Sequence, residues 1–153
     1  MLSASCHYAL QAMFYIALHS TDNENVELSE IAEKQNIPKH FLSKILQLLV
    51  KHKLLTSMKG PNGGFSLIKP PEQVTLIEII EAIDGLDIFT QCGLSYRPCD
   101  DNNPCQIHKE YKKIREKGYQ LFNTKTLAGF TEDLKNGSGF ASIIKPEHEK
   151  TNE

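Results

Sequence analysis

Residues 29–65 carry the clearest structural pattern of the chain, and they read SEIAEKQNIPKHFLSKILQLLVKHKLLTSMKGPNGGF. The stretch opens with a short helix over residues 30–35, for which Ser29 is the expected N-cap. Asn36 and Ile37 form the turn, and Pro38 is expected at the first position of a second helix, where its missing N–H costs nothing. That helix continues to about residue 52. Two helices joined by so short a turn predict a helix-turn-helix.

A β-hairpin is expected directly after the second helix. Residues 54–58 and 65–68 are apolar runs typical of strands, and residues 59–64, KGPNGG, separate them. Asn-Gly between two apolar runs is a strong hairpin signal. A hairpin that follows a helix-turn-helix is a wing. The predicted fold class is therefore mainly α with a small β-hairpin, a winged helix-turn-helix.

Further helices are expected on both sides of this module. A first helix runs to about His19, with Ser3 or Ser5 as its N-cap, and Thr75 caps a short helix over residues 76–83 that Gly85 ends. Residues 1–85 are thus expected to form one winged helix-turn-helix domain. In this helix over residues 76–83, Glu78 is expected on the solvated side.

The next segment, residues 86–106, is rich in cysteine. Residues 91–108 read QCGLSYRPCDDNNPCQIH and hold three of the four cysteines of the chain. Its Pro, Gly, Asn and Asp exclude a regular helix or strand until about Cys105. In a reducing compartment, clustered cysteines are more often metal ligands or redox sensors than structural disulfides. We therefore predict a loop whose thiolates converge.

A long helix is expected after the loop. Apolar residues recur along it at helical spacing: Ile107, Tyr111, Ile114, Gly118, Leu121 and Phe122. Such a narrow apolar seam usually pairs with another helix, and a second copy of the chain is the commonest partner. Residues 107–135 are therefore predicted to form a dimerisation helix and a short terminal helix capped by Thr126. The polar residues 136–153 are predicted to be a disordered tail.

The charge distribution favours a nucleic-acid partner. The 153-residue chain has a formal net charge of −2, yet residues 34–71 contain seven lysines and no acidic residue. Such a local basic patch attracts a polyanion. The predicted contacts are four residues at the start of the second helix and two in the wing: Lys39, His40, Ser43, Lys44, Lys59 and Asn62. Phe41, Leu42, Ile45 and Leu46 are expected in the core.

Composition also limits the place of the protein in the cell. No apolar run approaches the roughly 18 residues that span a membrane, and the first residues, MLSASCH, lack the basic region of a signal peptide. A cytoplasmic location without membrane contact is the expectation.

The chain resembles a known family in four features. These are Tyr8–Ala12 (YALQA), the helix-turn-helix, the wing 59–65 (KGPNGGF) and the three-cysteine loop, and they resemble the IscR/NsrR/CymR-type winged-helix transcription regulators. The resemblance implies a bacterial homodimer that binds a palindromic operator in double-stranded DNA. It also implies an iron–sulfur cluster in the loop, because the cysteine-metabolism branch of the family lacks these three cysteines.

Four ligands are expected for such a cluster, and three cysteines leave one open. Cys92, Cys99 and Cys105 supply the thiolates. His108 is the favoured fourth ligand, because it follows Cys105 by three residues and a histidine completes the cluster in the iron–sulfur-assembly regulators that the chain resembles. His7, next to Cys6, is the alternative. A 2Fe–2S cluster is favoured and a 4Fe–4S cluster is the second option; the six residues between Cys92 and Cys99 are one more than in many relatives.

Other functions of the loop stay open at this point. A cluster-free regulator could act through zinc, through a thiol switch among Cys92, Cys99 and Cys105, or through a partner protein. No pair of cysteines has the close spacing typical of zinc fingers. An enzyme is not expected, because the chain has no Cys-x-x-Cys pair and no spaced set of nucleophile, base and orienting residue. No small-molecule substrate is expected either.

Overall fold

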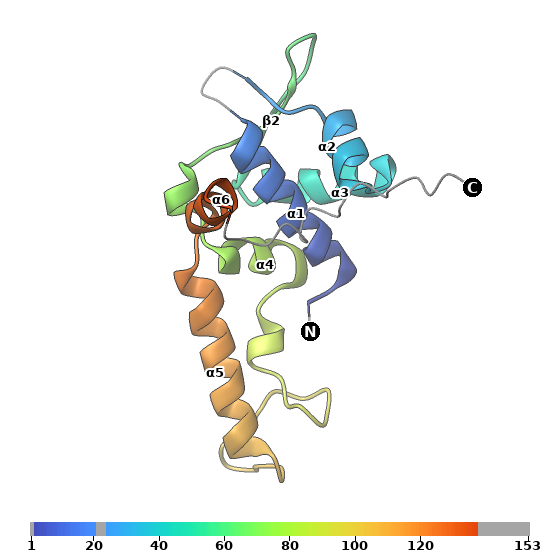
Figure 1. Cartoon of the computed structure of the whole chain (residues 1–153). Helices are drawn as coiled ribbons and strands as arrows, with labels where there is room; N and C mark the ends of the chain where they lie inside the picture. The colour runs from blue at the N-terminus through green and yellow to red at the C-terminus, as the bar shows by residue number, and fades with distance from the viewer. Residues whose placement is uncertain (1, 21–23, 138–153) are drawn as a thin grey trace, which may run out of the picture.

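Helix α1 is the centre of the molecule (Figure 1). The structure, a computed structural model, describes residues 2–20 and 24–137. Helix α1 spans Ala4–His19, and the hydroxyl of Ser3 caps it by accepting from the backbone N–H of Cys6 at 3.0 Å. Helices α2, α3, α4 and α6 and strand β2 all contact it. Its buried residues are Cys6, Ala9, Ala12, Met13, Phe14, Tyr15 and Ile16.

The helix-turn-helix is confirmed, with small differences at its caps. Helix α2 spans Leu28–Gln35 and helix α3 spans Lys39–Lys51. Asn36 takes a left-handed conformation, with φ 52°, and ends α2 in the turn as expected. The predicted cap Ser29 is wrong, because α2 begins two residues earlier than expected and Glu27 is its N-cap. Pro38 is also the N-cap of α3 rather than its first residue.

The wing is a two-stranded antiparallel hairpin. Strand β1 (Leu55–Met58) pairs with strand β2 (Gly64–Leu67). Val26 adds a bridge to Phe65, which ties the wing to the segment before α2. Gly64 is required here, because its φ is 137° and a Cβ would lie 2.5 Å from the Val26 carbonyl oxygen. The wing projects from the top of the molecule in Figure 1.

Two short helices close the domain against α1. The 3₁₀ turn η1 (Pro71–Gln73) precedes helix α4 (Leu76–Asp84), and helix α6 (Leu127–Lys135) packs against η1 and α1. Phe14 of α1 stacks on Phe130 of α6, with ring centroids 3.9 Å apart. The side chain of Glu78, which was predicted on the solvated side, is 33% exposed; its carboxylate accepts from the Thr75 backbone N–H at 2.9 Å and pairs with Lys69 at 2.6 Å.

Helix α5 extends away from this core. It spans His108–Thr124, and the cysteine-rich segment, which begins with the 3₁₀ turn η2 (Asp87–Phe89), lies beside it at the end of the molecule opposite the wing (Figure 1). No regular helix or strand lies between residues 91 and 106, as predicted. The tail prediction concerns residues 136–153, all but two of which lie outside the described residues. The fold class, mainly α with a small hairpin and a long C-terminal helix, is confirmed.

Candidate functional site

The cysteine-rich loop folds back on itself and packs against α5. The Cys92 backbone N–H donates to the Arg97 carbonyl and the Cys99 N–H donates to the Thr90 carbonyl, both at 2.9 Å. These bonds form a tight turn that carries Cys92 and Cys99 on its two ends. A Cβ at Gly93 would lie 3.0 Å from the Tyr111 ring, so the loop backbone approaches α5 closely at that point.

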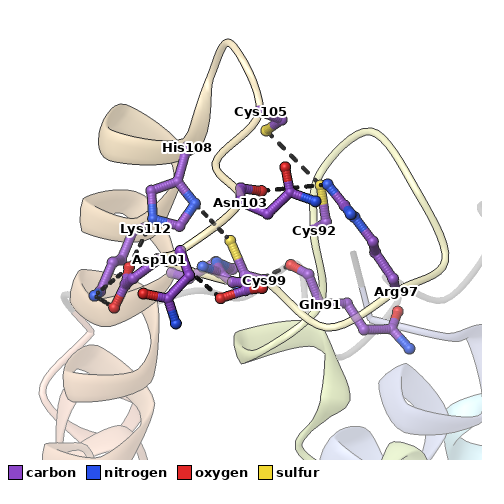
Figure 2. Close-up of polar contacts among 12 residues, drawn as sticks. Gln91, Cys92, Arg97, Cys99, Asp101, Asn103, Cys105, His108 and Lys112 are labelled. Atoms are coloured by element: carbon purple, nitrogen blue, oxygen red, sulfur yellow. Dashed lines mark hydrogen bonds and ion pairs between the residues drawn. The ribbon is translucent and has the colours of Figure 1, made fainter.

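The four predicted ligands of the loop form two pairs. The Sγ atoms of Cys92 and Cys105 lie 3.8 Å apart, and the Sγ of Cys99 lies 3.1 Å from Nδ1 of His108 (Figure 2). Cys105 and His108, three residues apart, do not share a turn of the helix. Instead, α5 begins at His108 and the imidazole faces Cys99, while Cys105 precedes the helix and faces Cys92.

Two charged residues hold the His108 ring from its other side. Nε2 of His108 lies 2.7 Å from Oδ1 of Asp101, and the Lys112 ammonium lies 3.0 and 2.9 Å from the two oxygens of Asp101. Hydrogen bonds from Lys112 and, to a smaller extent, from His108 hold the pKa of the Asp101 carboxyl below its usual range. The same ion pair raises the pKa of Lys112. His108 itself is buried, with 7% of its surface exposed.

The sulfur of Cys92 accepts hydrogen bonds from the residues that follow it in the loop. The Leu94 backbone N–H donates to its sulfur at 3.5 Å. This bond, with donors from Ser95, stabilises the thiolate and lowers the pKa of Cys92 to about 7. Thiolate is the form that binds metals and the form that attacks oxidants, so the site is chemically competent for both.

Arg115 anchors the start of the loop to α5. Its guanidinium donates to the Gln91 carbonyl at 2.7 Å and lies 5.3 Å from the centre of the Tyr111 ring. Only 7% of Arg115 is exposed. The sequence-based reasoning missed Arg115, Asp101 and Lys112. A signal was present, because His108, Lys112 and Arg115 recur at helical spacing and share one face of the helix.

His7, the alternative fourth ligand, is not part of the cysteine loop. His7 is exposed on α1, outside the loop pairs. Its neighbour Cys6 is fully buried, and burial, with the nearby charge of Asp84, raises the pKa of the Cys6 thiol to about 12. Cys6 is therefore an inert core residue in this chain.

The donors of the loop suit a metal group. With metal–sulfur bonds of about 2.3 Å and tetrahedral angles, two thiolates on one ion lie about 3.8 Å apart. The Cys92–Cys105 distance is 3.8 Å. The 3.1 Å between Sγ of Cys99 and Nδ1 of His108 is shorter than the roughly 3.5 Å between a thiolate and an imidazole on one tetrahedral ion. Among the described residues, no group of three Cys, His, Asp or Glu side chains is placed to hold one metal ion. Thiolates and an imidazole are donors that suit an iron–sulfur cluster or zinc.

The predicted DNA contacts lie on the surface of the other end of the molecule. Lys39, His40 and Lys44 are exposed at the start of α3, and Ser43 is half-buried among them. Lys59 and Asn62 are exposed in the wing, where the Asn62 carbonyl accepts from the Asn25 side chain at 3.0 Å. These six residues keep the surface positions that their predicted role requires.

The core predictions for α3 are mostly confirmed. Leu42, Ile45 and Leu46 are buried. Phe41 is the exception, because 37% of it is exposed. The centroids of the Phe41 and Tyr8 rings lie 5.8 Å apart in an edge-to-face arrangement.

Comparison with known proteins identifies the family. The model of the Rrf2 family, described as iron-dependent transcriptional regulators, matches residues 2–133. The chain belongs to the Rrf2 family. A protein of Aquifex aeolicus named as an HTH-type transcriptional regulator is 33% identical over 129 residues, which are 83% of this chain and 88% of the relative. The HTH-type transcriptional regulator IscR of Yersinia pestis is 32% identical over 127 residues, 83% of this chain and 76% of the relative.

Solved structures show the same Rrf2-type fold. IscR of T. potens superposes with a TM-score of 0.73 at 24% identity and covers 92% of both chains. CymR of B. subtilis, the global cysteine regulator, superposes with a TM-score of 0.72 at 21% identity and covers 86% of this chain and 96% of its own. By its family and its IscR relative, this Rrf2-family chain is a bacterial transcription regulator. The relatives are named as regulators rather than enzymes, which supports the non-enzymatic expectation. No helix in the described residues has the length and apolarity to cross a bilayer.

Proposed function

We propose that this Rrf2-family chain is a homodimeric DNA-binding regulator whose operator affinity depends on a 2Fe–2S cluster. Cys92, Cys99, Cys105 and His108 would hold the cluster, and His7 would not. The observation that carries the proposal is the arrangement of these four donors in two pairs, at 3.8 and 3.1 Å. Each pair suits one iron of a two-iron cluster, in which each iron takes two protein ligands.

The residues of the loop suit this task chemically. Thiolates bind iron, and the lowered pKa of Cys92 makes that form available near neutral pH. When bound, the cluster would supply one-electron redox chemistry and sensitivity to oxidants. A histidine in place of one thiolate makes the site less negative and raises its reduction potential. A regulator that senses redox or iron–sulfur status needs such a site.

DNA contact belongs to the opposite end, residues 1–85. In a helix-turn-helix the start of the second helix enters the major groove. There Lys39 and Lys44 can reach guanine edges or phosphates, and His40 and Ser43 can add polar contacts. The wing residues Lys59 and Asn62 would approach the neighbouring backbone or minor groove. A palindromic operator matches a dimer with two such ends.

Helix α5 supplies the surface that joins two chains. Ile107, Ile114 and Leu121 recur every seven residues and are 37%, 64% and 52% exposed. A seven-residue apolar repeat is the pattern with which two helices pair along one seam. Residues 107–135 are therefore the proposed dimerisation region. Because the cysteine loop, residues 86–106, packs on α5, ordering of the loop can change how two α5 helices meet and so the separation of two recognition helices.

The decisive experiment measures iron, sulfide and zinc in protein purified without oxygen. Two irons and two sulfides per chain, with a visible absorption spectrum, are the expected result. Cys99→Ala should abolish iron retention, and Cys6→Ala is the matched control because Cys6 lies in the core of α1. Zinc without sulfide, or full iron in Cys99→Ala, contradicts the proposal.

A thiol switch is the second candidate, and one observation favours it. The Cys92 and Cys105 sulfurs are neighbours at 3.8 Å, so a small approach would join them. A peroxide could oxidise the two thiols to a disulfide with release of water. Mass spectrometry of iron-free protein treated with peroxide distinguishes this function. A Cys92–Cys105 disulfide that changes operator affinity would support it, and reversal by dithiothreitol would confirm the switch.

A further inference from the structure

We propose that Asp101 is a positioning residue that directs Nδ1 of His108, rather than Nε2, toward the cluster thiolates. The inference rests on the proposed function for the cluster itself. The contact between Asp101 and His108, however, is present in the protein without metal and can be tested separately. Neither the cysteine spacing nor the sequence pattern around His108 indicates which ring nitrogen is used.

The two nitrogens of the imidazole have different neighbours. Nε2 lies 2.7 Å from Oδ1 of Asp101, and Nδ1 lies 3.1 Å from Sγ of Cys99 (Figure 2). An ionised carboxylate can only accept a hydrogen bond, so Nε2 must carry the proton in this contact. In the neutral ring, Nδ1 then keeps the lone pair that a metal ion needs. The lone pair points at the thiol of Cys99.

Lys112 fixes the carboxylate in place. Asp101 belongs to the loop, and 68% of its side chain is exposed, so it would otherwise sample several rotamers. Lys112 follows His108 by four residues and lies on the same face of α5. Its ammonium contacts both oxygens of Asp101, at 3.0 and 2.9 Å. An exposed carboxylate is thus held against a buried ring, whose side chain is only 9% exposed.

The arrangement has a consequence for the cluster. A carboxylate on the far nitrogen of a histidine ligand fixes the orientation of the ring and increases its basicity, and loss of such a partner typically lowers metal affinity about 10- to 100-fold. The negative charge of Asp101 also favours the more positive, oxidised state of the cluster. Removal of that charge should therefore raise the reduction potential.

The first test uses metal-free, reduced protein labelled with ¹⁵N-histidine. The Nε2–H proton of His108 should be visible by NMR at neutral pH, because the bond to Asp101 slows its exchange with water. Asp101→Ala should lose this signal, and Lys112→Met should weaken it. Asp100→Asn is the matched control, because the neighbouring carboxylate accepts from the Asn102 backbone N–H at 2.9 Å and does not touch His108. A signal that persists in Asp101→Ala overturns the proposal.

The second test uses protein reconstituted with iron and sulfide. Asp101→Asn, which keeps the shape and removes the charge, should raise the reduction potential, and Asp101→Ala should lose iron to a chelator at least about tenfold faster than wild type. Asp100→Asn should match wild type in both. Equal potentials and equal rates overturn the role of Asp101. If wild type binds no cluster, the proposed function fails, while the NMR result still decides whether Asp101 holds His108.

Discussion

The two ends of the molecule are built in different ways. At the end that carries the helix-turn-helix and the wing, helices α1 to α4 and α6 bury a continuous cluster of apolar side chains. Between residues 83 and 126, by contrast, the buried side chains are His108 and Arg115, and both are polar. Five of the nine large exposed apolar side chains of the described residues also fall in this stretch: Leu94, Tyr96, Ile107, Ile114 and Leu121.

The two ends therefore differ in what stabilises them. Apolar burial stabilises the end that carries the helix-turn-helix and the wing. The loop and α5 are held by hydrogen bonds, ion pairs and the contacts of the Phe89 ring with Tyr119 and Phe122, so a ligand or partner can change their local stability. Such a contrast suits the proposed switch, and four substitutions test it.

Leu46→Ala should destabilise the whole domain. Leu46 is fully buried in the core, and such a truncation costs about 2–5 kcal/mol of unfolding free energy. Leu94→Ala in the loop is the matched control, because 63% of Leu94 is exposed, and it should change the unfolding free energy of metal-free protein by less than about 0.5 kcal/mol. Denaturant unfolding measures both. Similar losses in the two variants would contradict the contrast between the ends.

Arg115→Met should loosen the loop and leave the helix-turn-helix and the wing intact. The Gln91 carbonyl would lose its charged donor, a bond worth about 1.5–3 kcal/mol. Hydrogen exchange at the Cys92 and Cys99 backbone amides should therefore accelerate at least about tenfold. Exchange in α3 should not change. Lys109→Met, an exposed substitution on the same helix, serves as the control, and equal protection in the two variants would argue against the anchor.

Lys44→Ala should weaken operator binding without affecting the loop. Loss of one contact to a base or phosphate should reduce affinity about tenfold, and a phosphate contact would also lower the salt slope by about one. Binding titrations at several salt concentrations measure this. Lys135→Ala, at the exposed end of α6, should bind DNA as wild type does. An unchanged affinity for Lys44→Ala would remove α3 from the proposed interface.

Glu78→Gln should lower the unfolding free energy by at most about 1 kcal/mol. The loss should occur only at a pH at which the Glu78 carboxyl of the wild type is ionised. Burial alone would raise the pKa of Glu78, but hydrogen bonds from Lys69 and Thr75 hold it below its ordinary value. A lowered folded-state pKa means that the carboxylate stabilises the fold above its unfolded pKa of about 4.3 and loses this effect as the pH falls through the folded value.

The matched comparison for this cap is Glu81→Gln, an exposed substitution on the same helix. Thermal unfolding at pH 7 and at pH 3 should show a wild-type advantage over Glu78→Gln that shrinks in acid. Because the Glu78 side chain is 33% exposed, solvent screening limits the effect. A constant difference at both pH values would mean that the capping bonds do not depend on the charge.

Local sequence patterns were sufficient to predict the elements and most of their ends. Ser3, Thr75 and Thr126 are the caps that were predicted, and Asn36 turns the chain between α2 and α3. These features depend on residues within one helical turn of each other, and so local patterns are sufficient. The errors at Ser29 and Pro38 are shifts of a cap by a residue or two. Apolar spacing likewise identified Leu42, Ile45 and Leu46 as core.

The contacts between side chains in the loop could not be predicted from the sequence. The sequence predicted four ligands but not how they pair. The pairing of Cys92 with Cys105 and of Cys99 with His108 follows from the path of an irregular segment beside α5. The contacts of Arg115 with Gln91, 24 residues apart, depend on the same path. A loop without periodicity has no local rule that fixes such contacts, because long-range packing and hydrogen bonding select one closure among many.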